Sequence, residues 1–309
     1  MQRLYYTESE EGPVQRITAA CAQIAVAPMD VAENLRRAVA WTRRAVEESG
    51  AQLIVLPETI TTGFTPDVGP EALWDAVDAV PGALWEPLQR VVQDLGVFLA
   101  FGSYERGPER GVVYNSAMLL GPDGGFLGVY RKTHLFPVEV RANGGWSTPG
   151  TEPVVIHTPL ASIGLTICYD GDFPELYRAE TLLGAEVILR PSALLRSFEI
   201  WELTNRARAY DNHVYMVACN AVGPDAGNNF YFGHSMIVDP ISHKLAQARG
   251  TEEVIYAELN PDPIKYITYG AKTPMIFDHL RDRNLDAYRD ILQPGRSRFE
   301  PAKRAASDP

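Results

Sequence analysis

The stretch SIGLTICYDGDFPELYRAETLLGAEVILRPS, residues 162–192, carries the pattern that decides the fold class. The apolar run SIGLTI ends in a polar turn, and PELYRAETLLGA follows, with Pro174 suited to the first turn of a helix and Gly184 to its end. A second apolar run, AEVIL, comes directly after that helix. Two buried strands joined through a helix are typical of an α/β protein whose sheet is at least partly parallel.

The flanking segments extend this alternation. Residues 17–26 and 51–58 are predicted strands, and residues 31–49 between them are a predicted helix with apolar side chains on one face. Asp30 and Glu33 have the spacing of an N-terminal cap and its reciprocal partner, and Gly50 suits the stop. Further helices are predicted at 83–95 and 198–212, and further strands at 96–104, 185–192 and 214–220.

Hairpins interrupt the alternation of strands and helices. They are predicted at 113–132, 153–170 and 232–250, each as two apolar runs joined by turn residues. The sheets are therefore expected to be mixed, and helices covering one face of each of two sheets would accommodate the pattern.

Composition limits the functions open to this chain of 309 residues, which is 46% hydrophobic. A net charge of −11 argues against a nucleic-acid partner, and no apolar run approaches the roughly 18 residues of a membrane helix. The start MQRLYYTESEEG is too polar for a signal peptide, and three widely spaced cysteines argue against a disulfide framework. A cytoplasmic protein of one domain is expected (1–309), with a polar extension over 1–15, a core over about 17–275 and a tail over 276–309.

Several predicted strands end in a residue that could take part in chemistry, and ligands gather at the carboxyl ends of strands in α/β sheets. Strand ends often meet polar loops for no functional reason, so it is their recurrence that points to a catalytic pocket. The residues in question are Glu58, Cys168, Arg190, Ser192 and Asn220.

Cys168 differs from the other two cysteines. Cys21 and Cys219 lie beside alanines within apolar strands and are expected to be small buried hydrophobes. Cys168 ends its strand at a turn into a helix, where a sulfur could protrude into a cleft and nearby backbone N–H groups could hold an oxyanion. Its thiolate would need a neighbouring base or cation, for which Glu58 and Lys132 are candidates.

These segments resemble the motifs of the carbon–nitrogen hydrolase (nitrilase) superfamily. LPETITTGF is similar to the family's glutamate motif, YRKTHLF to its lysine motif and ICYDGDFPELYR to its cysteine motif, in the family's order. RARAYDNHVYMVACNAVG and GHSMIVDP resemble later family segments, so the resemblance runs from about residue 17 to 275.

The resemblance implies a four-layer α-β-β-α sandwich with two mixed sheets and a Glu58–Lys132–Cys168 triad. It implies attack of the thiolate on a C–N carbon, loss of ammonia and hydrolysis of a thioester by water that the glutamate activates. Lys132 and the backbone N–H of Tyr169 would hold the oxyanion, and Glu139 would orient the substrate or the lysine. No metal or organic cofactor is implied, and a homo-oligomer, a dimer or larger, is expected.

The residues after the cysteine favour hydrolysis of a small-molecule amide. CYDGDFPE resembles amidases more than nitrilases, which typically have Cys-Trp-Glu, whereas relatives with CYDLRFPE act on ω-amides or other small amides. Because Gly171 and Asp172 replace Leu-Arg, an arginine for a substrate carboxylate could be absent, with Arg190 or Arg196 as substitutes. Other residues near the motifs could line the acyl pocket or simply pack: Tyr114, Trp146, Ser192, Leu194 and Trp201.

Four alternatives stay open at this point. Within the family they are hydrolysis of N-carbamoyl amines or amino acids and hydrolysis of nitriles. Outside hydrolase chemistry they are an inactive binding protein on the same fold and a metal enzyme using Asp170, Asp172 and Glu175, whose spacing fits no known loop pattern.

Overall fold

The fold is described from a computed structural model that places residues 16–261, 268–269, 273–274, 278–295 and 299. The extension predicted over 1–15 lies outside the described residues, as do parts of the tail predicted over 276–309. None of the helices in the described residues has the length and apolar character of a transmembrane span.

Two six-stranded sheets form the centre of the molecule. The first has the order β14-β1-β2-β3-β4-β5, with β14 (Glu253–Leu259), β1 (Ile17–Gln23), β2 (Leu53–Val55), β3 (Phe98–Arg106), β4 (Val113–Leu120) and β5 (Phe126–Arg131). The second has the order β13-β12-β9-β8-β7-β6, with β13 (Lys244–Gln247), β12 (Met236–Val238), β9 (Tyr215–Asn220), β8 (Val187–Ser192), β7 (Ser162–Leu165) and β6 (Val155–His157).

Both sheets are mixed, as the hairpins predicted. Strands β1, β2 and β3 run parallel, and so do β7, β8 and β9, whereas the outer strands of each sheet pair antiparallel. Besides the short helix α2 (Pro70–Ala76), smaller elements complete the described chain. They are β10 (Val222–Pro224), β11 (Phe230–Phe232), β15 (Thr268–Tyr269), β16 (Thr273–Pro274) and the 3₁₀ turns η1 (Ala83–Trp85), η2 (Pro137–Glu139), η3 (Arg141–Asn143), η4 (Cys168–Asp172) and η5 (Leu285–Tyr288).

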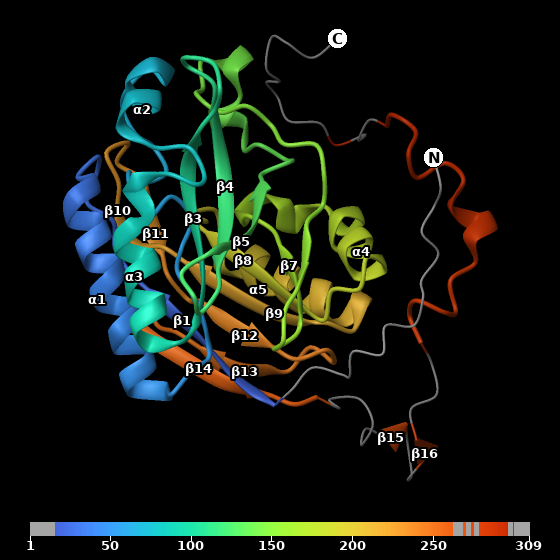
Figure 1. The fold of residues 1–309 in the computed structure, drawn as a ribbon. Coiled ribbons are helices and arrows are strands. Elements are labelled where there is room, and N and C mark those ends of the chain that lie inside the picture. The colour runs from blue at the N-terminus through green and yellow to red at the C-terminus, as the bar shows by residue number, and fades with distance from the viewer. Residues whose placement is uncertain (1–15, 262–267, 270–272, 275–277, 296–298, 300–309) are drawn as a thin grey trace.

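Helices cover the outer face of each sheet. The helices α1 (Val31–Ser49) and α3 (Glu86–Leu95) pack on the first sheet, and α4 (Pro174–Leu182) and α5 (Phe198–Asn212) pack on the second. Figure 1 shows the two pairs of helices on opposite sides of the stacked sheets. The four-layer α-β-β-α sandwich is therefore confirmed.

The alternation of side chains along β1 shows how the layers meet. Ala19 and Cys21 belong to the core between the sheets, whereas Ala20 and Ala22 face the helices of the first layer. Such a period of two is expected of a strand buried on both faces. Cys21 and Cys219 are both free and fully buried, which agrees with their predicted packing role.

The ends of α1 agree in part with the sequence. The Asp30 carboxylate accepts a hydrogen bond from the Glu33 backbone N–H at 3.1 Å, and Gly50 ends the helix at φ +63°. The reciprocal bond is not formed, because the Glu33 carboxylate pairs with Arg36 instead. The helix predicted at 83–95 starts as the 3₁₀ turn η1 and continues as α3.

Glu180 is a fully buried carboxyl group on α4 that plays no part in the site described below. Burial raises its pKa well above the ordinary value, Asp170 raises it further, and the Val154 amide offsets this only in part. The folded protein therefore holds the carboxyl protonated at pH values where the unfolded chain has ionised it. Stability is lost as pH rises from the unfolded pKa toward the raised folded pKa.

We predict that Glu180→Gln stabilises the fold at pH 8 more than at pH 5, because an uncharged amide removes this linkage. The free energy of unfolding of the variant relative to the wild type should grow by up to about 1.4 kcal/mol per pH unit until the pKa of Glu180 in the folded protein is reached. Denaturant unfolding of both proteins at the two pH values measures it. An equal effect of the substitution at pH 5 and pH 8 would contradict a raised pKa for Glu180.

Candidate active site

Cys168 lies at a sharp turn between β7 and α4. It is the first residue of η4 and has φ +42°, a region that residues other than glycine rarely occupy. The carbonyl oxygen of Cys168 accepts two bonds from the Arg190 guanidinium, at 2.9 Å from Nε and 2.5 Å from Nη2. These bonds hold the backbone of the turn in place, and Cys168 as a whole residue is 6% exposed.

Glu58 follows the end of β2 and both of its carboxylate oxygens are held. Oε1 accepts from Lys132 Nζ at 2.8 Å and from Asn115 Nδ2 at 2.7 Å, and Oε2 accepts from the Ala193 backbone N–H at 2.8 Å. Gly102 on β3 permits this placement, because a Cβ there would lie 2.6 Å from the Glu58 Cα. The carboxylate is therefore fixed in position and fully buried.

Lys132 follows β5 and its ammonium group lies between two carboxylates. Nζ is 2.8 Å from Glu58 Oε1 and 2.6 Å from Glu139 Oε2, and all three side chains have no exposed surface. Burial alone would lower the pKa of Lys132, but Glu139, Glu58 and Cys168 together raise it above its usual value. Lys132 is thus a permanent cation in the site.

Asn115 on β4 joins the two carboxylates. Its Nδ2 donates to Glu58 Oε1 and to Glu139 Oε1, both at 2.7 Å. Glu139, in η2, also accepts from the Phe136 backbone N–H at 3.0 Å. Burial raises the pKa of Glu139, and the neighbouring Lys132 ammonium works in the opposite direction.

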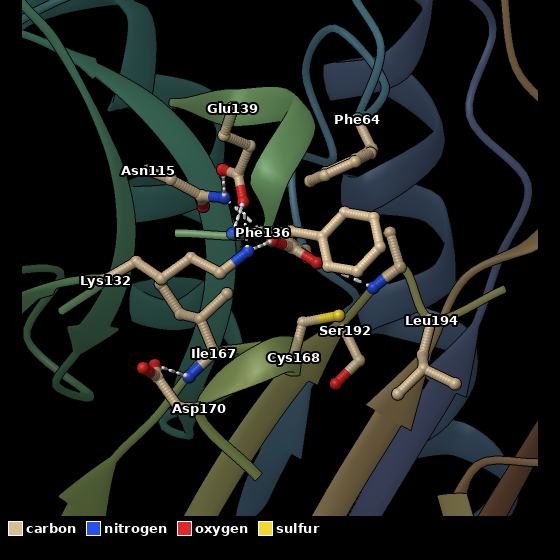
Figure 2. Close-up of polar contacts among 12 residues, drawn as sticks. Phe64, Asn115, Lys132, Phe136, Glu139, Ile167, Cys168, Asp170, Ser192 and Leu194 are labelled. Atoms are coloured by element: carbon tan, nitrogen blue, oxygen red, sulfur yellow. Dashed lines mark hydrogen bonds and ion pairs between the residues drawn. The ribbon is translucent and has the colours of Figure 1, made fainter. Parts of the chain in front are cut away.

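The Cys168 thiol lies close to these groups. Burial raises its pKa and the Glu58 charge raises it further, while Lys132, Arg190 and the Ala193 N–H lower it. The balance keeps the resting thiol protonated beside a carboxylate that can take the proton. Figure 2 shows how the labelled groups surround the sulfur of Cys168: Asn115, Lys132 and Glu139 on one side, and Phe64, Phe136 and Leu194 on the other.

Asp170 ties the lysine segment to the cysteine turn. Its carboxylate accepts from the Ile167 backbone N–H at 2.9 Å and from the Tyr130 hydroxyl at 2.8 Å. It also accepts from the His134 backbone N–H at 3.1 Å and contacts the imidazole Nδ1 at 2.9 Å. Asp170 is buried and serves as a brace between the segments that carry Lys132 and Cys168.

The acidic residues considered as a metal site do not gather around one point. Asp170 is used as just described, and Asp172 forms an ion pair with Arg196. Among the residues that the structure describes, no group of three His, Cys, Asp or Glu side chains is arranged to hold a metal ion.

A small pocket opens beside the Cys168 thiol. Its lining is mostly apolar and aromatic: Phe64, Phe136, Cys168, Tyr169, Ala193, Leu194, Leu195 and Arg196. Tyr169 and Leu194 were expected from the sequence, whereas Phe64 and Phe136, which end the quoted glutamate and lysine motifs, were not singled out as pocket residues. Trp146 is not among the residues that line this pocket. It packs against Phe64, and its indole N–H donates to the Tyr104 hydroxyl at 2.7 Å.

The structure places Arg190, Ser192 and Tyr114 elsewhere than the sequence suggested. Arg190 is fully buried under the cysteine turn, with Nη1 bonded to Thr204 and Asn205, so it supports the backbone of Cys168 and does not line the pocket. The Ser192 hydroxyl donates to the Arg190 carbonyl, and the Tyr114 ring lies under the Arg131 guanidinium. Trp201 donates from its ring nitrogen to the His234 carbonyl, in the core.

The sandwich and the site with its cysteine, lysine and glutamates are typical of enzymes that cleave carbon–nitrogen bonds with a thiol. The carbon-nitrogen hydrolase family model matches residues 18–268. The chain belongs to the carbon–nitrogen hydrolase family, and it is a hydrolase.

Named relatives cover most of the chain. An omega-amidase of Saccharomyces cerevisiae is 29% identical over 286 residues, which are 90% of this chain and 96% of that protein. An omega-amidase of Xenopus tropicalis is 32% identical over 245 residues, which are 77% of this chain and 86% of that protein.

Solved structures give the same fold. An amidase from Nesterenkonia sp. has a TM-score of 0.74 at 26% identity, over 92% of this chain and 100% of that one. A mutant of the same amidase carries the acetamide moiety of fluoroacetamide on its active site cysteine, with a TM-score of 0.75 at 26% identity, over 91% of this chain and 100% of that one.

Proposed function

We propose that this protein is an amidase that hydrolyses a small-molecule amide to a carboxylic acid and ammonia through a thioester on Cys168. The observation that carries the proposal is the fixed Glu58 carboxylate beside the Cys168 thiol, with the Lys132 ammonium 2.8 Å from that carboxylate. The omega-amidases and the Nesterenkonia amidase support the same chemistry.

In the first half of the reaction, Glu58 accepts the proton of the Cys168 thiol as sulfur attacks the amide carbon. The new C–S bond gives a tetrahedral intermediate with a negative oxygen. Glu58 then returns its proton to the nitrogen, the C–N bond breaks, and ammonia leaves a thioester behind. One carboxylate thus serves as base and then as acid, which general acid–base catalysis by a single positioned side chain allows.

In the second half, Glu58 takes a proton from water as the water oxygen attacks the thioester carbon. The C–S bond breaks, the carboxylic acid leaves, and the sulfur recovers its proton from Glu58. The buried setting matters here, because electrostatic effects of fixed charges are stronger away from bulk water.

Lys132 and the backbone N–H of Tyr169 would hold the negative oxygen in both halves. Two hydrogen bonds of the ammonium go to Glu58 and Glu139, and an ammonium carries three N–H donors. The third donor can therefore be directed at the oxyanion. Glu139 and Asn115 keep the ammonium in place while its partner Glu58 gains and loses a proton.

Ammonia release from a panel of compounds tests the proposal. The panel holds short aliphatic amides, amides of dicarboxylic acids, aromatic amides, N-carbamoyl compounds and nitriles. We expect release from one or more amides at rates above those from the carbamoyl compounds and nitriles. Release only from the last two classes would keep the triad and reject the amidase assignment, and silence across the panel would reject it as well.

A further inference from the structure

Arg196 places a guanidinium in the lining of the pocket that holds the Cys168 thiol. It lies in the segment after β8, with its Cζ 5.3 Å from the centre of the Tyr169 ring. Side-chain exposure of 27% leaves it accessible from solvent. An arginine at this position would be a natural partner for a substrate carboxylate, because its planar fork binds two carboxylate oxygens at once.

The Asp172 carboxylate is already bound to the Arg196 guanidinium. Arg196 Nη1 donates to Asp172 Oδ2 at 2.7 Å and Nη2 donates to Oδ1 at 2.8 Å, in a bidentate pair. Asp172 is the last residue of η4, the same short turn that starts at Cys168, so it is held beside the pocket. A substrate carboxylate would have to displace this carboxylate or lie against its charge.

Among the described residues that line the pocket, no other side chain is a cation. The other pocket residues besides Cys168 and Tyr169 are apolar: Phe64, Phe136, Ala193, Leu194 and Leu195. The other nearby cations are committed, since Lys132 is bonded to two carboxylates and Arg190 to the Cys168 carbonyl. An uncharged acyl chain, by contrast, contacts apolar surface, and no charged group has to be desolvated when it enters the pocket.

From this geometry we infer that Asp172 is a specificity-determining residue. By binding Arg196, it withholds the guanidinium from substrates and restricts the pocket to amides with a short, uncharged acyl group. This inference rests on the proposed amidase function and adds its substrate class. Asp172 touches neither the triad nor Glu139 through any described hydrogen bond, so its role is separable from the chemistry.

Two amides matched in length provide the test: pentanamide, and glutaramate, whose chain ends in a carboxylate. We expect the wild type to show a kcat/KM for pentanamide at least about tenfold above that for glutaramate. Asp172→Asn, and more strongly Asp172→Ala, should raise kcat/KM for glutaramate by about tenfold or more, as a charge-assisted hydrogen bond to substrate allows. The same variants should keep kcat/KM for pentanamide within about threefold, which also shows that the site is intact.

The variant Asp172→Ala/Arg196→Gln is the matched control. The gain on glutaramate should disappear in it, and in the single variant it should shrink at high salt, because an exposed charge pair is screened. The inference would be overturned if the wild type preferred glutaramate or if the Asp172 variants showed no selective gain on glutaramate. In either case, hydrolysis of one of the two amides would still support the amidase proposal. Absence of hydrolysis of every amide in the wild type would instead remove the amidase proposal, and this inference with it.

Discussion

Cys168→Ala should abolish amide hydrolysis while leaving the protein folded. Loss of the nucleophile removes both the attack on the amide and the thioester, so kcat should fall by at least about 10⁴-fold, as for other covalent catalysts. The fold should survive because the substitution removes one buried atom, and the turn is held by the Arg190 bonds to the Cys168 carbonyl, which do not involve the side chain. Ammonia release and circular dichroism of the purified variant measure the two effects.

Cys21→Ala is the matched control for this experiment. Cys21 is also a free, fully buried cysteine, but it lies in the core between the sheets. We expect the control to keep most of the activity, and mass spectrometry of the quenched wild type with a slow amide should find the acyl group on the peptide that contains Cys168. Retention of more than about 1% of wild-type activity by Cys168→Ala would show that another group is the nucleophile.

The fold could be predicted wherever one segment carried its own signal. The helix α1 has a cap, an apolar face and a terminal glycine within one stretch, and its predicted bounds match the structure. Strand β14 was not predicted, although it pairs with β1 along seven residues, because its partner lies far away in the chain and its own burial is patchy. The short helix α2 (Pro70–Ala76) was also missed, since only Leu73 on it is buried.

The residues alone predicted the site as a set of strand ends with Lys132 as a candidate cation, and the family resemblance supplied the triad and Glu139. Glu58 and Cys168 end apolar runs, so their meeting could be expected from topology, whereas Asn115 lies inside β4, where the sequence pattern resembles any core strand. Arg190 also ends a strand, but its guanidinium turns under the cysteine. The space for it exists because position 171 is glycine, where a Cβ would lie 1.9 Å from the Arg190 Nη2. Such close approaches depend on tertiary packing and leave no mark in a local pattern.

Glu58→Gln should separate nucleophile formation from turnover. Glutamine has the shape of glutamate and can still accept from Lys132, but it cannot take the thiol proton or activate water. Because Glu58 serves both halves of the reaction, we expect kcat/KM to fall by about 10³- to 10⁴-fold, at the upper end of general-base effects. Ammonia release measures this loss, and Glu180→Gln, the same change at another buried carboxyl, should leave turnover unchanged.

In the same variant, the reactivity of Cys168 toward an alkylating reagent at a given pH should rise, whereas turnover should fall. Burial raises the pKa of the thiol and the Glu58 charge adds to that rise, so removing the charge lowers the pKa while Lys132 and Arg190 continue to favour the thiolate. The rate of alkylation by iodoacetamide should therefore reach its plateau at a lower pH in Glu58→Gln than in the wild type, even though hydrolysis is lost. A plateau shifted to higher pH would mean that Glu58 stabilises the thiolate and does not oppose it. A lower thiol pKa together with lost turnover is the result expected when Glu58 both opposes the resting thiolate by its charge and transfers the proton during the reaction.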